Sequence, residues 1–265
     1  TGAVVMARFD DNIGVVSNTV VVYVAGVRAL SNGVFQSGFS GTLTRTNATG
    51  FKATVDRTAP FTNLQTVSAS GAARDGAGNL VLTNWSFTTL DVRPPTVVLT
   101  SPAAGSSGVA TNAVVIVKFD DNVAVVSNTV VIYLSGVRAL SNGVFQGGGA
   151  GSLTRTNATA FHAVVDRTAP FGSAAVIGVT ASARDSAANA RSTNFSFTTV
   201  DVTPPQIAAF SPASGSVLAT NDLIAFDVTD NVGIVTTSIH VRLATNGVTN
   251  TVFTNGSGVG GYGAS

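Results

Sequence analysis

The residues in this sequence best suited to chemistry are aspartates that recur in short polar motifs. All thirteen acidic residues are Asp, because Glu is absent. Asp120 and Asp121 open the motif DDNVAVV, Asp185 opens DSAAN, and Asp91 stands three residues before a pair of prolines. Carboxylate oxygens are hard ligands, which suit Ca²⁺. These segments therefore form a candidate calcium site, provided that the fold brings them together.

The same aspartate motifs return further along the chain. Asp201 precedes the second proline pair, and Asp230 opens DNVGIV. Carboxylates that converge repel one another unless a cation neutralises them, which favours Ca²⁺. The alternative is turn chemistry, because Asp and Asn accept hydrogen bonds from neighbouring backbone amides and tolerate left-handed conformations. The chain therefore carries either no cofactor or Ca²⁺.

Catalytic constellations are missing from the sequence. The two histidines, His162 and His240, fall in different repeats of the chain, and Lys52 stands at the position equivalent to His162. The sequence contains no nucleophile elbow, phosphate-binding loop or zinc-spaced ligand set. Glycosidase chemistry needs two carboxylates in a cleft, and aspartates at loop tips are poor candidates. We therefore expect that the chain is not an enzyme.

Composition excludes several further classes of function. Hydrophobic residues make up 45% and charged residues 10% of the chain, so its surface must consist largely of Thr, Ser, Asn and Gly. A net charge of +1 without a basic cluster offers no electrostatic footprint for nucleic acid or anionic membrane. No apolar run reaches the about eighteen residues of a membrane span. Cysteine is absent, so stability must come from packed cores.

The chain is built from repeats of about 110 residues. The segment from Asp10 to Phe61 returns from Asp120 to Phe171 with about three quarters of its residues unchanged. We assign repeat one to residues 1–90, repeat two to 91–200 and repeat three to 201–265. We expect repeat one to lack its first strand and repeat three to be incomplete, and so expect a longer polypeptide.

Each repeat has the pattern of an all-β domain. Apolar segments of period two, separated by Gly, Asn, Ser and Pro, predict seven or eight strands in repeat two. The expected strands are 96–100, 113–119, 129–134, 152–156, 160–166, 176–184 and 193–199, with a short one near 144–146. This pattern predicts tandem immunoglobulin-like β-sandwiches. Phe195 and Phe197 should face the core, as should Trp85 and Phe87 in repeat one.

The proline pairs and the sandwich topology place the aspartates. Pro94-Pro95 and Pro204-Pro205 restrict the linkers, so the array should form a semi-rigid rod. In such a sandwich, the loop after the second strand and the loop before the last strand lie where the chain enters. We therefore expect four aspartates of repeat two to meet at the junction with repeat one, namely Asp91, Asp120, Asp121 and Asp185. Asp201 and Asp230 should meet at the next junction.

The motifs together resemble a known family. The run DVRPPTVVLTSPAAGSSGVAT, followed by KFDDNVAVV, SARDSAAN and TNFSFTT, resembles the bacterial Ig-like repeats of surface proteins and adhesins, including those called SbsA-like. Similar units occur in phage structural proteins. The resemblance implies a structural or adhesive module at the cell surface, a spacer or stalk of a larger protein. Alternatives are a virion fibre or decoration domain, or a subunit of an extracellular filament or surface layer. The expected partners are neighbouring repeats and identical chains.

Sequons offer one further candidate modification. Asn47-Ala48-Thr49 and Asn157-Ala158-Thr159 occupy equivalent positions in repeats one and two. Such sites accept N-linked glycans in a suitable host. In a chain rich in Thr and Asn they also arise by chance.

Overall fold

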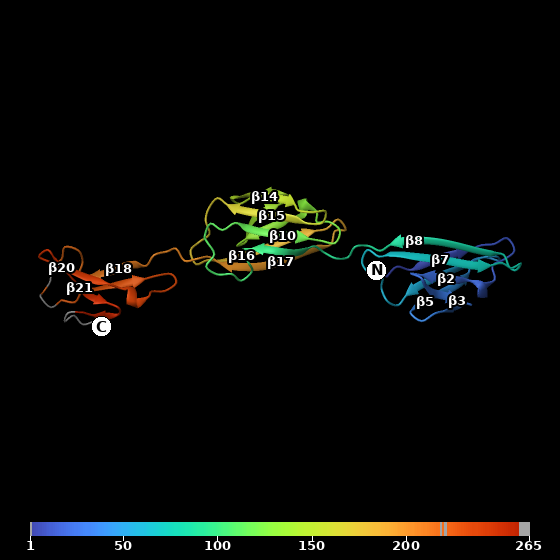
Figure 1. Ribbon diagram of the computed structural model, residues 1–265, viewed down its shortest axis with the longest axis horizontal. Coiled ribbons are helices and arrows are strands. Elements are labelled where there is room, and N and C mark those ends of the chain that lie inside the picture. Colours follow the sequence, from blue (N-terminus) through green and yellow to red (C-terminus); the bar gives the residue numbers. More distant parts are fainter. Residues whose placement is uncertain (1, 218, 220–221, 260–265) are drawn as a thin grey trace.

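The chain folds into consecutive β-sandwiches. The computed structural model describes residues 2–217, 219 and 222–259, and within these the only helices are three 3₁₀ turns, η1 (Ser17–Thr19), η2 (Ser127–Thr129) and η3 (Thr236–Ser238). The strands form three groups that follow one another along the longest axis of the molecule (Figure 1). This arrangement confirms the expected all-β class.

Repeat two contains two antiparallel sheets. One has the strand order β14-β15-β10-β9 and the other the order β13-β12-β11-β16-β17. The bounds are β9 (Thr96–Ser101), β10 (Val115–Asp120), β11 (Val131–Leu134), β12 (Val137–Ser141), β13 (Val144–Phe145), β14 (Gly149–Arg155), β15 (Phe161–Arg167), β16 (Val176–Arg184) and β17 (Ala190–Thr198). All eight expected strands are present, with shifts of a few residues at their ends.

One strand of repeat two was not expected from the sequence. β12 pairs with β11 across a turn in which Ser135 and Gly136 have φ values of 48° and 80°. Two successive positive φ angles are the mark of a type I′ hairpin, for which Asn-Gly is the usual sequence signal. The pair Ser135-Gly136 does not carry this signal, so β12 was not predicted.

Over its described residues, repeat one has the same two sheets without a counterpart of β9. Their strand orders are β1-β6-β5 and β4-β3-β2-β7-β8. The bounds are β1 (Val5–Phe9), β2 (Val21–Val24), β3 (Val27–Ser31), β4 (Val34–Phe35), β5 (Phe39–Arg45), β6 (Phe51–Arg57), β7 (Thr66–Arg74) and β8 (Leu80–Thr88). Residues of repeats one and two that match in sequence thus lie in matching strands.

Repeat three is described as two small sheets. One pairs β18 with β19, and the other has the order β20-β21-β22. The bounds are β18 (Gln206–Ser211), β19 (Ala225–Thr229), β20 (Val241–Thr245), β21 (Val248–Thr254) and β22 (Ser257–Gly258).

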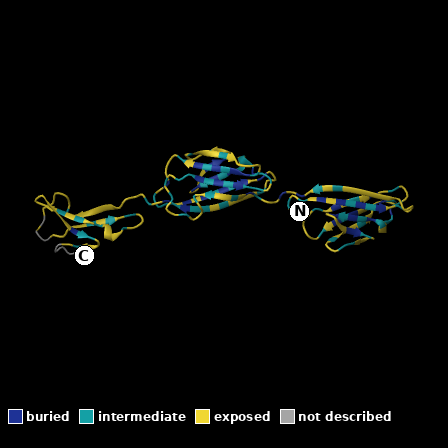
Figure 2. Ribbon diagram, viewed as in Figure 1, coloured by how far each residue is buried: buried dark blue, intermediate teal, exposed yellow. Residues whose placement is uncertain are grey.

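The cores of repeats one and two lie between their sheets, as the burial colouring in Figure 2 shows. In repeat two, Phe119 and Phe197 are each 1% exposed. Phe195 packs against the same core, which confirms that both aromatics of β17 face inward. Trp85 and Phe87 pack against the core of repeat one. Apolar burial between the sheets is the main source of stability, since there are no disulfides.

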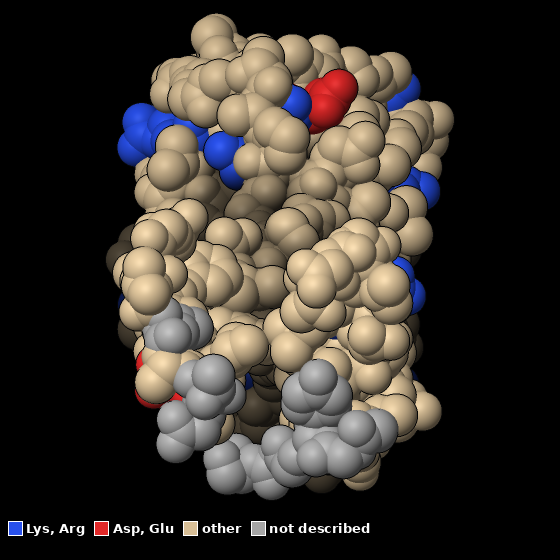
Figure 3. Space-filling view, turned by 90° about the vertical axis from the view of Figure 1, so that its left-hand side faces the viewer, with Lys and Arg blue, Asp and Glu red and all other residues tan. Residues whose placement is uncertain are grey.

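Charged side chains contribute little to the surface. Figure 3 views the end that carries β20 and β21, and its few charged residues are scattered over an uncharged surface. Among the described residues, the one salt bridge joins Arg8 and Asp10 at 2.6 Å, with both side chains exposed. Several arginines instead cover aromatic rings, as Arg167 covers Phe171 at 4.8 Å from the ring centroid. Cation–π contacts of this kind stabilise exposed sites modestly.

Candidate metal centre at the junction of repeats one and two

Three aspartates of repeat two meet where the chain enters the sandwich. Asp91 lies in the linker, Asp121 directly follows β10, and Asp185 lies in the turn between β16 and β17. Each offers a carboxylate oxygen, and these oxygens lie within 4.8 Å of one another. Asp91 and Asp185 are buried and Asp121 is half-buried. An isolated antiparallel bridge between Val125 and Asp185 holds the loop after β10 beside the turn between β16 and β17.

The loops that carry Asp121 and Asp185 are held by turn hydrogen bonds. Asp121 Oδ2 accepts bonds from the amides of Val123 at 2.9 Å and Ala124 at 3.2 Å. Asp185 accepts from the Asn189 amide at 2.8 Å through Oδ1 and from Asn189 Nδ2 at 2.7 Å through Oδ2. The turn chemistry expected from the motifs is therefore present in both loops. It fixes the carboxylates in place.

Asp91 ties the two repeats together. Its Oδ1 accepts a hydrogen bond from Asn63 Nδ2 of repeat one at 2.8 Å and one from Asn122 Nδ2 of repeat two at 3.1 Å. Asn63 Oδ1 in turn accepts from the Val92 amide at 2.6 Å. Asn189 Nδ2 donates to the Asp91 carbonyl oxygen at 3.2 Å. One linker residue thus bonds to loops of both sandwiches.

Two carboxylate oxygens of the cluster have no partner. Asp91 Oδ2 and Asp121 Oδ1 are buried without a hydrogen bond in the part of the chain that the structure describes. Buried polar atoms are nearly always paired, so each exception needs a cause. Hard oxygen donors at this spacing can hold a divalent cation.

The pKa of Asp91 reflects its environment. Burial raises the pKa of the carboxyl group, but hydrogen bonds from Asn122, the Arg93 amide and Asn63 outweigh burial and hold the pKa below its ordinary value. A carboxyl whose pKa is lowered by folding stabilises the folded state above its unfolded pKa. That contribution is lost as the pH falls through the folded pKa.

We therefore expect Asp91 to make the stability of the junction sensitive to acid. The unfolding free energies of the native chain and of Asp91→Asn should differ above about pH 4 and converge as the pH falls to about 2. Urea denaturation across this range measures the difference. A difference that grows as the pH falls would contradict the assigned sign.

Asp120 lies outside the cluster, contrary to the expectation from the sequence. Its Oδ1 accepts hydrogen bonds from Thr159 Oγ1 and from the Asp121 amide, each at 2.9 Å. Asp120 is the last residue of β10, and successive side chains of a strand point to opposite faces. Only one of two adjacent aspartates can therefore point at Asp91.

The junction of repeats two and three has the same kind of linker contacts as the first junction. Asp201 Oδ1 accepts from Ser173 Oγ of repeat two at 2.5 Å and from Asn231 Nδ2 of repeat three at 3.2 Å. Asp230 Oδ1 accepts from the amides of Val232 and Gly233. Hydrogen bonds, that from Ser173 foremost, lower the pKa of Asp201. Asp201 and Asp230 are the counterparts of Asp91 and Asp121.

Two junction residues, Asn63 and Ser173, were missed from the sequence. They occupy equivalent positions just before β7 and β16, and each bridges its repeat to the aspartate of the next linker. Because one is Asn and the other Ser, the repeat gives only a weak sign of a shared role. The recurrence of a hydrogen-bonding residue at this position was the only available signal.

The candidate glycosylation residues are exposed turn formers. Asn47 Oδ1 accepts from the Thr49 amide at 2.9 Å, and Asn157 Oδ1 accepts from the Thr159 amide at 2.8 Å. Both are exposed. Glycan attachment at either residue stays a prediction.

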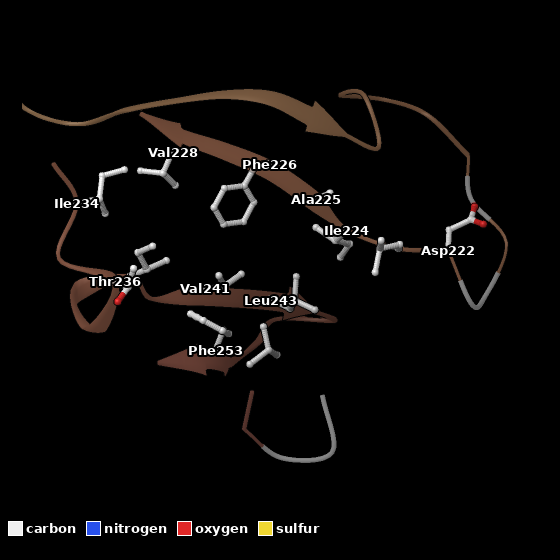
Figure 4. A pocket seen from close by; sticks show the side chains of 13 residues that line it. Asp222, Ile224, Ala225, Phe226, Val228, Ile234, Thr236, Val241, Leu243 and Phe253 are labelled. Carbon is white, nitrogen blue, oxygen red and sulfur yellow. The ribbon is translucent and has the colours of Figure 1, made fainter. Parts of the chain in front are cut away.

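A groove of about 660 Å³ in repeat three is lined mainly by apolar side chains from β19, β20 and β21 (Figure 4). Phe226 and Leu243 line it. When Asp230 of repeat three is aligned with Asp121 of repeat two, these residues correspond to Val117 and Leu134, which are core residues of repeat two. The groove is therefore the open face of a sandwich core.

Together, the paired sheets and bridged linkers define a protein of tandem Ig-like modules. Residues 91–199 match the family described as bacterial Ig-like domain. Tandem modules of this kind are typical of extracellular surface proteins and are usually non-catalytic. No curated protein matches the chain. No helix of the described residues is long and apolar enough to cross a membrane.

Solved structures of other modular proteins are similar to this chain at low identity. A chimeric titin Z1Z2 is 12% identical over 75% of this chain and 89% of its own, with a TM-score of 0.28. Fibronectin(III)-like modules of CbhA from Clostridium thermocellum are 14% identical over 76% of this chain and 87% of theirs, with a TM-score of 0.26. The protocadherin GammaB4 extracellular domain is 15% identical over 72% of this chain and 31% of its own, with a TM-score of 0.42.

Proposed function

We propose that this chain is a semi-rigid, non-catalytic spacer within a larger extracellular surface protein. The observation that carries the proposal is the Asp91 carboxylate, which accepts hydrogen bonds from Asn63 in repeat one and Asn122 in repeat two. A flexible tether needs no such bridge. A spacer does, because its length is useful only if successive modules keep a fixed direction.

The chemistry of the linker supports this role. Hydrogen bonds to a charged group contribute about 1.5–3 kcal/mol each, more than neutral ones. Pro94 and Pro95 restrict the backbone immediately after Asp91, and Pro95 is buried. Bending the junction would therefore break charged hydrogen bonds and expose buried surface.

The second junction supports the same role. Asp201 accepts bonds from Ser173 and Asn231 on either side of the linker, and Pro204-Pro205 follow it. A linker aspartate that bonds to both neighbouring repeats recurs at successive junctions. This suits an array whose length grows with the number of modules. Its immediate partners are the neighbouring repeats, and a distant part of the protein carries any adhesive surface.

Immunogold electron microscopy on the producing cells tests the location and the role together. Antibodies raised against the 265-residue chain should label intact cells, with gold particles at a narrow range of distances outside the envelope. Label confined to virions would favour a fibre or decoration domain. A regular lateral lattice would favour an assembly subunit, and either result would contradict the spacer.

A further inference from the structure

We infer that the cluster of Asp91, Asp121 and Asp185 is a binding site for Ca²⁺. The inference goes beyond the spacer role, because these residues could bind the ion whether the array spaces or assembles. It rests on the arrangement of the carboxylates and on two oxygens that the protein leaves without a partner.

The unpartnered oxygens point to an ion more directly than the acidic cluster itself. Asp91 is only 8% exposed; its Oδ1 is fully engaged by Asn63 and Asn122, whereas its Oδ2 has no partner. The two carboxylate oxygens of Asp121 differ in the same way. Oδ2 accepts hydrogen bonds from backbone amides, whereas Oδ1 is buried and has no hydrogen bond in the described chain. Turn chemistry explains the engaged oxygens and leaves the other two unexplained.

The donor set selects the class of ion. All three residues offer carboxylate oxygen, and the sequence has no cysteine. Zinc sites favour sulfur and nitrogen ligands, so zinc does not suit this set. Mg²⁺ demands near-ideal octahedral geometry and gives up its waters reluctantly, whereas Ca²⁺ accepts irregular carboxylate sites. Ca²⁺ is therefore the ion that fits best.

Repeat one provides an internal comparison. Asp11 and Asp75 stand where Asp121 and Asp185 stand in repeat two, and they make the same turn hydrogen bonds. Asp75 is half-buried, whereas Asp185 is 3% exposed. The described part of repeat one contains no group of three carboxylates close enough to share a metal ion. Repeat one therefore has the same two loops without a linker aspartate beside them.

Calorimetry on the intact chain tests the site. Titration with CaCl₂ should show saturable binding with a dissociation constant of about 10⁻⁴–10⁻³ M, as in extracellular modules. Ca²⁺ at about one hundred times that constant should raise the Tm of repeat two by roughly 10–15 °C. Mg²⁺ at the same concentration should give a smaller shift. Absence of both heat and Tm shift would overturn the inference.

Asp121→Asn separates metal binding from turn formation. The asparagine oxygen can still accept the bonds from Val123 and Ala124, so the loop should survive while the Ca²⁺-dependent Tm shift disappears. In EDTA the variant should unfold at or above the native Tm, because a like charge is gone. The matched control is Asp11→Asn in repeat one, which should keep the full response to Ca²⁺. Unchanged Ca²⁺ affinity in Asp121→Asn, or an equal loss in Asp11→Asn, would overturn the site.

Discussion

Replacing Gly151 with alanine should destabilise repeat two by about 3–5 kcal/mol, among the largest effects of any single substitution. Gly151 lies in β14 with φ at +148°, and an added Cβ would lie 1.9 Å from the carbonyl oxygen of Val164 on β15. The obstacle is backbone, so no side-chain rotation can relieve the clash. Urea denaturation of the intact chain, followed by the transition of repeat two, measures the loss.

Gly178→Ala is the matched control for this substitution. Gly178 lies in β16, its φ is outside the left-handed region, and an added Cβ would meet nothing within 4 Å. Alanine there should leave stability unchanged or raise it by about 0.4–1 kcal/mol through the unfolded state. Gly41 has the same clash in repeat one, where Cβ would lie 1.9 Å from the Thr54 carbonyl oxygen. Equal stability of Gly151→Ala and Gly178→Ala would contradict the observed β14–β15 approach.

Phe197→Ala should cost about 3–5 kcal/mol, which approaches the total stability of a small domain. Phe197 is 1% exposed and packs edge-to-face on Phe171, with ring centroids 5.6 Å apart and planes at 82°. Alanine removes this contact and leaves a cavity between the two sheets. Thermal unfolding should show a lower Tm for repeat two and an unchanged transition for repeat one.

Val176→Ala provides the control for the core substitution. Val176 begins β16 in the same sheet and is 69% exposed, so its loss should change stability by less than about 0.5 kcal/mol. A small effect of Phe197→Ala would mean that the two sheets do not share a packed core. It would therefore argue against the sandwich itself.

Most of the fold could be predicted because alternating apolar residues encode both the strands and their inward faces. The expected strand at 176–184 has the bounds of β16, and the alternation in β17 placed Phe195 and Phe197 on the core side. β12 could not be predicted because its hairpin turn is Ser135-Gly136. Both residues have positive φ angles, but the pair is not the Asn-Gly signal usual for such a turn.

The candidate site was predictable in its location and less so in its members. Sandwich topology alone brings the linker and two loops to one end, which is why Asp91, Asp121 and Asp185 could be expected together. Which of Asp120 and Asp121 points inward depends on where β10 ends, and patterns locate strand ends only within a few residues. The role of Asn63 depends on a contact between two repeats, which no pattern within one repeat encodes.

The most direct test of a semi-rigid spacer is a distance distribution across the first junction. Because the native chain has no cysteine, Val34→Cys and Val144→Cys create two unique labelling sites on exposed, equivalent positions of repeats one and two. Pulsed electron paramagnetic resonance between spin labels there should give one narrow distance peak, which broadens when Pro94 and Pro95 are both changed to glycine. A broad distribution with the native linker, unchanged by the glycine substitutions, would contradict the spacer.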